Sequence, residues 1–255
     1  MKKAVFSFVI AFLGILTLQS CNINSEIVYH KDLSSTTVMD IDVREFMKEM
    51  KAMTPDSLKD QKEFGEMDKF PTTWTSLYDM DKKEGKLKAT DPDSVRIMKK
   101  IFMKSNKEGN EVAGFSLKMD HFNTQDYMAL NNLNQEEKLP IDQNVFNNWD
   151  GKTLIINTEN FNLKSLQAAL ASKNPEMETD DGSMGKIEGM MLMFFKNIGT
   201  TLRFENKIKS VTGKHDWFKQ IDDHSVRIQY DLEALFDKDS ARLKDADKEI
   251  VIVTE

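Results

Sequence analysis

Hydrophobic and polar residues alternate along several short segments, and a period of two predicts β-strands. The clearest strands are predicted over 200–210 and 225–232, and weaker ones over 37–43 and 112–119. In each, charged or polar residues occupy the opposite face, as is common in antiparallel sheets with one solvated face. The predicted inward positions are Met39, Ile41, Val43, Ala113, Phe115, Leu117, Met119, Leu202, Phe204, Ile208, Val226, Ile228, Tyr230 and Leu232.

Two further features extend the predicted sheet. Asp150-Gly151 is a two-residue hairpin signal between Val145–Trp149 and Lys152–Asn157. The short apolar run Ile250–Val253 is typical of a central strand.

Helices are predicted where apolar residues recur every three or four positions or where a capping residue begins a segment. The most regular is 186–198, whose stripe includes Met190, Phe194 and Ile198. A second begins at Asp91-Pro92 and carries Val95, Met98, Ile101 and Phe102 before Gly109. The remaining predicted helices are Arg44–Met53, Thr124–Leu133 after the cap Asn123, and Leu163–Ala171 after the cap Asn162.

Strands and helices are mixed irregularly, without a repeat of fixed period. This order predicts an α+β fold in which helices cover one face of a largely antiparallel sheet. We expect residues 21–255 to form a single domain. The alternative is two sub-domains divided near residue 180, within the loose stretch Asn174–Gly185.

Composition and charge narrow the class of partner. Of the 255 residues, 40% are hydrophobic and 30% charged, which is ordinary for a globular protein. Lys and Arg number 35 against 42 Asp and Glu, a net charge of −7. Such a chain lacks the positive footprint that binds a phosphate backbone, so nucleic acid is not an expected partner.

The N-terminus is predicted to be a secretory signal. Lys2 and Lys3 precede the apolar stretch Ala4–Leu18. As a helix this stretch spans about 22 Å, less than the roughly 30 Å hydrocarbon core of a bilayer. Residues 1–20 therefore fit a cleaved signal peptide rather than a permanent membrane helix.

The next residues resemble the lipobox of bacterial lipoproteins. Leu18-Gln19-Ser20-Cys21 has the order Leu, variable residue, small residue, Cys. The resemblance implies that Cys21 becomes the first mature residue and carries acyl chains such as palmitate. Cys21 is the single Cys of the sequence, so no thiol remains for a disulfide or a nucleophile. Two or three chains, at about 0.8 kcal/mol per buried methylene, would anchor the protein stably.

The residues after Cys21 indicate the cellular location of the protein. By the enterobacterial sorting pattern, Asn22 in place of Asp implies the outer membrane. Asn22–Ser25 contains no acidic run of the kind associated with surface export, which favours the periplasmic side. We expect these residues to be a short tether. The composition and stretches such as Glu26–His30 and Phe204–Ile208 are similar to uncharacterised envelope lipoproteins of Bacteroidota, which implies no catalytic residue.

Methionine is unusually frequent, at 16 residues. Met47, Met50 and Met53 form one cluster and Met190, Met191 and Met193 another. Core packing is the favoured interpretation, because Met fills irregular cores. The alternatives are a thioether copper site and an apolar ligand cavity behind Met190, Phe194 and Phe195.

No sequence motif identifies a catalytic reaction or a bound metal. His30, His121, His215 and His224 are scattered without metal-ligand spacing, and no nucleophile elbow or phosphate-binding glycine loop is present. Asp79–Gly85 begins like a calcium loop but has Glu84 where Gly is required. We therefore expect a non-enzymatic binding or assembly module without cofactor or metal, whose partner is an envelope protein or an apolar ligand. A hydrolase stays an alternative if a His lies within reach of a Ser or carboxylate in a cleft.

Overall fold

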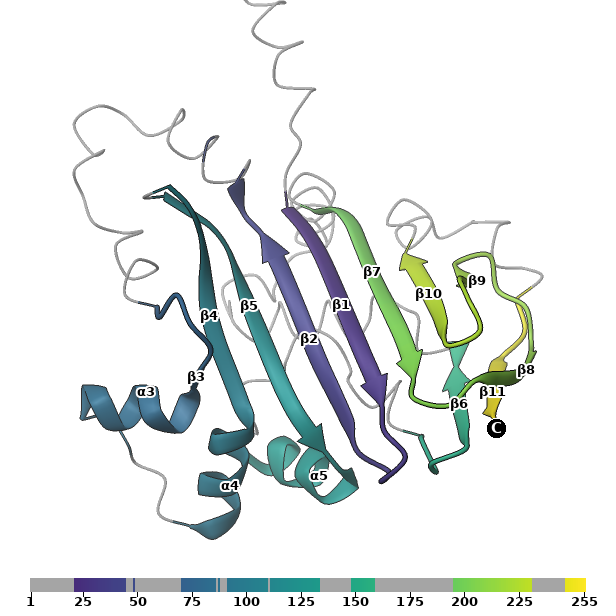
Figure 1. The fold of residues 1–255 in the computed structure, drawn as a ribbon, viewed down its shortest axis with the longest axis horizontal. Coiled ribbons are helices and arrows are strands. Elements are labelled where there is room, and N and C mark those ends of the chain that lie inside the picture. The colour runs from purple at the N-terminus through teal and green to yellow at the C-terminus, as the bar shows by residue number, and fades with distance from the viewer. Residues whose placement is uncertain are drawn as a thin grey trace, which may run out of the picture.

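The computed structural model describes residues 21–44, 48, 70–85, 87, 91–109, 111–133, 148–158, 195–230 and 246–255. Figure 1 shows a broad twisted sheet with helices at one end. In chain order the elements are β1 (Cys21–Tyr29), β2 (Ser35–Asp42), β3 (Thr75–Ser76), α3 (Leu77–Glu84), α4 (Pro92–Lys100), β4 (Ile101–Glu108), β5 (Glu111–Phe122), α5 (Thr124–Leu133), β6 (Thr153–Asn157), β7 (Phe195–Phe204), β8 (Ile208–Thr212), β9 (Phe218–Gln220), β10 (Ser225–Tyr230) and β11 (Glu249–Thr254).

Eight strands form the main sheet in the order β3-β4-β5-β2-β1-β7-β10-β9, and a smaller sheet has the order β6-β11-β8. Every neighbouring pair is antiparallel except β1 and β7, which run parallel. The α+β class and the largely antiparallel sheet are therefore confirmed.

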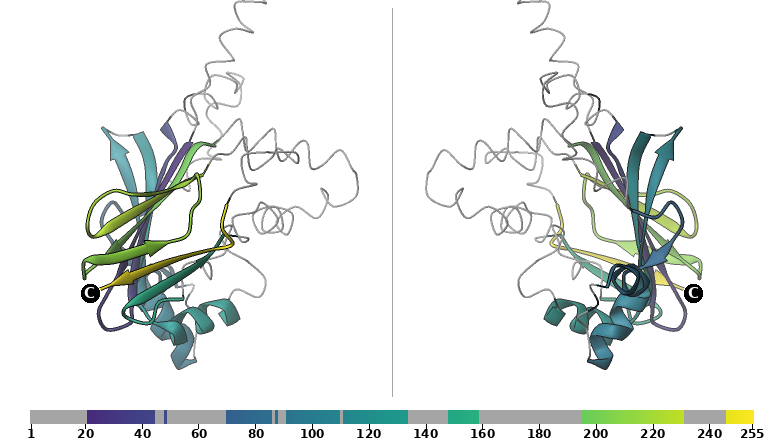
Figure 2. Two further views of the ribbon diagram at one scale, coloured as in Figure 1. Left: turned by 90° about the vertical axis from the view of Figure 1, so that its right-hand side faces the viewer. Right: turned by 90° about the vertical axis from the view of Figure 1, so that its left-hand side faces the viewer.

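The larger core lies between the two sheets. Alternate residues of β1, β7 and β10 face alternate residues of β6 and β11, as the period of two requires. The buried members are Ile27, Tyr29, Leu154, Ile156, Leu202, Phe204, Trp217, Val226, Ile228, Ile250 and Ile252. Figure 2 shows the smaller sheet, with β6 and β11, crossing the main sheet at an angle.

A second core holds two helices against β4 and β5. Ile97 of α4 and Tyr127 and Leu130 of α5 pack with Ile101, Met119 and Phe122. Both helices begin at side-chain caps, because the first backbone N–H groups of a helix have no partner within it. Asp91 Oδ1 accepts from Ser94 N at 2.8 Å. Asn123 and Asp126 cap α5 reciprocally, each side chain accepting from the other's backbone N–H.

Several elements predicted from the sequence are confirmed. The helix over Thr124–Leu133 is α5, the alternating segment after 225 is β10, and Ile250–Val253 lies in β11, the central strand of the smaller sheet. A turn is present at Asp150-Gly151, but it is longer than the predicted two-residue loop, because Trp149 pairs with Leu154 and Asp150 N donates to Thr153 O at 3.2 Å.

Three predicted boundaries are wrong because strand pairing overrides local preference. Residues 195–198 of the predicted helix 186–198 begin β7, which pairs with β1 on one side and β10 on the other. The predicted strand 200–210 is two strands in different sheets, β7 and β8. Helix α4 ends at Lys100, and Ile101 and Phe102 belong to β4.

The predicted inward faces of β2 and β5 are partly wrong. Val112, Gly114 and Ser116 are buried, while Phe115 and Leu117 are half-buried. Along β5 the buried positions change from Val112, Gly114 and Ser116 to Met119 and Phe122, because Met119 and Phe122 pack with residues of α4 and α5.

The predicted tether over Asn22–Ser25 is also wrong. These residues are part of β1 and pair with β2, from Asn22 opposite Asp42 to Ser25 opposite Met39. Strand structure therefore begins at Cys21 itself. Asp79–Gly85 is not a calcium loop, since Asp79 lies in the first turn of α3.

Some predictions fall outside the described residues. They concern the signal segment 1–20, most of helix 44–53, helix 163–171, the loose stretch 174–185 and residues 186–194.

The core between the sheets generates a stability prediction. Ile228 is fully buried, whereas Ile221 is 53% exposed. We expect Ile228→Ala to lower the free energy of unfolding by about 2–5 kcal/mol, because it leaves a cavity between the sheets. The matched Ile221→Ala should change it by less than about 0.5 kcal/mol. Denaturant titration measures both, and equal effects would contradict the assigned core.

Candidate functional site

The end of the main sheet opposite Cys21, here called the far end, gathers polar and aromatic side chains. It comprises the turn His30–Ser34 between β1 and β2, the last residues of β5, and Glu205 after β7 (Figure 1). These segments meet because β2, β1 and β7 are neighbours in the sheet and β5 pairs with β2.

His30 is held on both ring nitrogens. Nδ1 lies 2.8 Å from Glu205 Oε1, and Nε2 lies 2.9 Å from Thr36 Oγ1. Its ring stacks on that of His121, with centroids 4.4 Å apart and an interplanar angle of 4°. Two of the four scattered histidines are therefore brought face to face.

Thr36 and Asp120 extend this network. The Thr36 hydroxyl accepts from His121 N at 3.2 Å and lies 3.4 Å from Asp120 Oδ1, to which it can donate. Asp120 Oδ1 also lies 3.2 Å from His121 Nδ1. The network therefore connects the ends of four strands.

Hydrogen bonds stabilise the charged forms of two acids at the far end. The pKa of Glu205 is lowered, first by its bond with His30 and then by the backbone N–H of Lys31. The pKa of Asp32 is lowered chiefly by the hydroxyl and backbone N–H of Ser34. The turn is thus fixed by ionised carboxylates.

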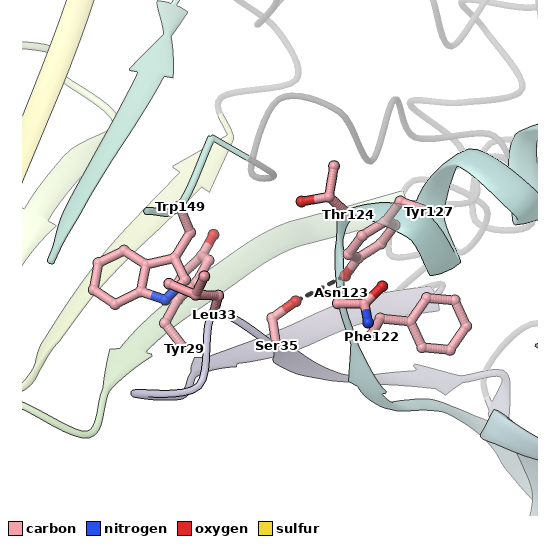
Figure 3. Close-up of a pocket in the computed structure, with 8 residues that line it drawn as sticks. All are labelled: Tyr29, Leu33, Ser35, Phe122, Asn123, Thr124, Tyr127 and Trp149. Carbon is pink, nitrogen blue, oxygen red and sulfur yellow. Dashed lines mark hydrogen bonds between the residues drawn. The ribbon is translucent and has the colours of Figure 1, made fainter. Parts of the chain in front are cut away.

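A small hollow lies beside the network, between the two cores (Figure 3). Tyr29 and Trp149 line one side and Phe122 and Tyr127 the other, with Ser35 Oγ 2.9 Å from Tyr127 Oη between them. Burial raises the pKa of Tyr29 well above its ordinary value. The volume open to the centre of a water molecule is about 10 Å³, room for a single water.

The backbone around this hollow is strained. Among the described residues, the two non-glycine residues with positive φ are Leu33, at 69°, and His121, at 49°. The side chain of Leu33 is also exposed, at 54%, and so is that of Met128 in α5, at 62%. Strained residues of this kind are over-represented at functional sites.

The order Thr36, His30, Glu205 is that of a nucleophile, a general base and an orienting acid. Two observations favour a structural role instead, in which these side chains link neighbouring strands. Thr36 Oγ1 already accepts from a backbone N–H, and neither Thr36 nor His30 lines the hollow.

The other sequence candidates are dispersed. His215 is buried, which lowers its pKa, and His224 donates from Nδ1 to Phe204 O at 3.0 Å. Met47, Met50, Met53, Met190 and Phe194 lie outside the described residues, and of Phe195 the backbone is described. Within the described ranges no group of three or more His, Cys, Asp or Glu could hold a metal ion. No helix in those ranges is long and apolar enough to span a bilayer.

Comparison with known proteins adds little. No protein-family model matches the chain, and no curated protein matches it. Among solved structures it is similar to the folded domain of Mycobacterium tuberculosis LppM, determined by NMR. The TM-score is 0.34 and the identity 9%, over 92% of this chain and 89% of that chain. At that TM-score the likeness supports no conclusion about fold or function.

The far-end network generates a pH prediction. Because the pKa of Glu205 is lowered in the folded state, its contribution to stability is complete above the ordinary value of 4.5 and is lost as the pH falls through the lowered pKa. We expect Glu205→Gln to cost about 0.5 kcal/mol at pH 7. Thermal unfolding across pH should show this difference shrinking in acid. A difference that grows below pH 4.5, or a similar loss in the exposed-site control Glu249→Gln, would contradict the assignment.

Proposed function

We propose that this chain is a lipid-anchored, non-enzymatic envelope protein that acts as a binding or assembly module. In this proposal Cys21 is acylated after removal of residues 1–20. The anchored protein lies on the outer membrane and faces the periplasm, as the residues after Cys21 favour.

The proposal rests mainly on the position of the lipobox cysteine, Cys21, in the fold. Cys21 is the first residue of β1, and its pairing neighbour is Phe195 at the start of β7. Since β1 lies inside the main sheet, acylation of Cys21 would fix the sheet to the bilayer without an intervening linker.

This attachment gives the molecule two unlike ends. The 9 residues of β1 span about 30 Å at roughly 3.3 Å each. Residues near Glu108, at the tip of the β4–β5 hairpin, share the end of Cys21, because Asn22, Asp42, Gly114 and Asn106 lie side by side across the sheet. The far end would then point away from the bilayer.

The far end is the best candidate for the binding surface. It combines the exposed Leu33 with positive backbone φ angles at Leu33 and His121. The proposal of a binding role rather than catalysis is supported by Thr36 and His30 serving as a tie between strands.

Acylation is tested by labelling. We expect Cys21→Ala to abolish incorporation of labelled palmitate and to leave an unprocessed precursor. Asn22→Ala is the matched control and should keep both labelling and processing. Continued labelling of the Cys21→Ala protein would disprove the lipid anchor.

The orientation is tested by energy transfer. Because acylation consumes Cys21, a cysteine introduced at Glu108 or at Leu33 would be the one reactive thiol. With an acceptor dye on lipid headgroups of reconstituted vesicles, transfer from position 108 should clearly exceed transfer from position 33. Equal transfer, or the reverse order, would rule out an attachment at the Cys21 end of the sheet.

A further inference from the structure

A cationic and aromatic cluster lies on the face of the main sheet opposite the α4–α5 core. Phe102 pairs with Lys118, and Lys104 pairs with Ser116, between β4 and β5. Phe102, Lys104 and Lys118 therefore share one face, and the two lysines are diagonal neighbours on it. Ile101 and Met119, each one position away, point to the helices instead.

Trp74 lies over these lysines. It immediately precedes β3, which pairs with β4 at Thr75–Met103 and Ser76–Phe102 and so holds Trp74 beside the cluster. Lys104 Nζ lies 5.0 Å and Lys118 Nζ 5.6 Å from the centroid of the indole ring. Lys118 Nζ is also 4.6 Å from the centroid of Phe102.

Neither ammonium group is in close contact with a described carboxylate. Such contacts do occur elsewhere in the described chain, as between Lys100 and Asp126 at 2.7 Å and between Lys207 and Asp223 at 2.8 Å. Lys104 forms no ion pair with a described residue, and the ion-pair contact of Lys118 is with Asp120 at 3.9 Å. The register thus places two positive charges against one aromatic ring, with Asp120 beside Lys118 and Asp40, which accepts from Ser116 Oγ, one strand further along the same face.

We propose that Lys104, Lys118 and Trp74 form a binding site for a phosphate group. A phosphate monoester carries a charge between −1.5 and −2, which matches two ammonium groups, whereas a carboxylate carries one negative charge. Lysine binds phosphate as a point charge, and the adjoining aromatic surface lowers the local dielectric and strengthens the attraction. Trp74 is 37% exposed, so an incoming ligand can reach the site.

The phosphate can belong to a soluble phosphate ester or to a lipid headgroup. A phosphate monoester presents the same oxygens and charge to the lysines in either form. The site is independent of the lipid anchor, because it depends on the pairing of β3, β4 and β5 and not on Cys21.

The test is a titration of the full chain in a non-ionic detergent. Inorganic pyrophosphate is added in one arm, and mixed micelles containing phosphatidic acid, a lipid phosphate monoester, in the other. Calorimetry measures binding, and tryptophan fluorescence reports on Trp74, the most exposed of the three Trp residues of the sequence. The test variant is Lys104→Gln/Lys118→Gln. The control Lys209→Gln/Lys219→Gln removes the same charge at exposed positions of β8 and β9.

We expect saturable binding that the test variant weakens by about tenfold or more and the control leaves nearly unchanged. Lys104→Arg/Lys118→Arg, which keeps both charges, should retain most of the affinity. Binding in the pyrophosphate arm alone would identify a soluble phosphate, and binding in the lipid arm alone a headgroup. Absence of saturable binding in both arms, or equal loss in test and control variants, would overturn the proposal. Circular dichroism checks that each variant is folded.

Discussion

The parallel pairing of β1 with β7 is the contact on which the rest of the structure depends. It joins Cys21–Tyr29 to Phe195–Phe204, segments separated by more of the chain than any other neighbouring pair in the main sheet. Without it the sheet would divide into β3-β4-β5-β2-β1 and β7-β10-β9. Closing so long a loop costs conformational entropy before any contact is gained, so the junction must be stabilised by the side chains along it.

Those side chains lie on both faces and at the end of the junction. On the inner face Ser25 Oγ lies 2.9 Å from Thr200 Oγ1, and the rings of Tyr29 and Phe204 stack with centroids 5.1 Å apart. On the outer face Arg227 of β10 reaches across β7 and donates to Asn24 Oδ1 at 3.0 Å. It can cross because Gly199 has no side chain, and a Cβ there would collide with the guanidinium. At the far end, the contact between His30 Nδ1 and Glu205 Oε1 joins the ends of the same two strands.

The sequence predicted those elements whose local pattern and tertiary role agree. β10, β11, α5 and the Asp150-Gly151 turn have clear alternation, caps or turn residues, and the structure keeps them. Prediction failed at residues 195–198, where helical spacing was overridden by pairing on both sides, and at Glu205, where one alternating segment passes from one sheet to the other.

The far-end network could not be predicted from spacing. His30, His121 and Glu205 are far apart in the chain and meet because of strand order. A usable signal was that His30 and His121 each stand at the end of an alternating segment, where loop residues gather. Lys104 and Lys118 likewise become neighbours through the β4–β5 register, which the sequence alone leaves undetermined.

Hydrogen exchange on the lipidated protein in detergent tests the central claim most directly, because β1 must begin at the acylated cysteine. If it does, the amides of residues 23–25 that bond to β2 or β7 should exchange as slowly as those of β7 itself. Exchange of residues 22–25 at the rate of an unstructured linker would contradict the account. It would restore a flexible tether between the anchor and the sheet.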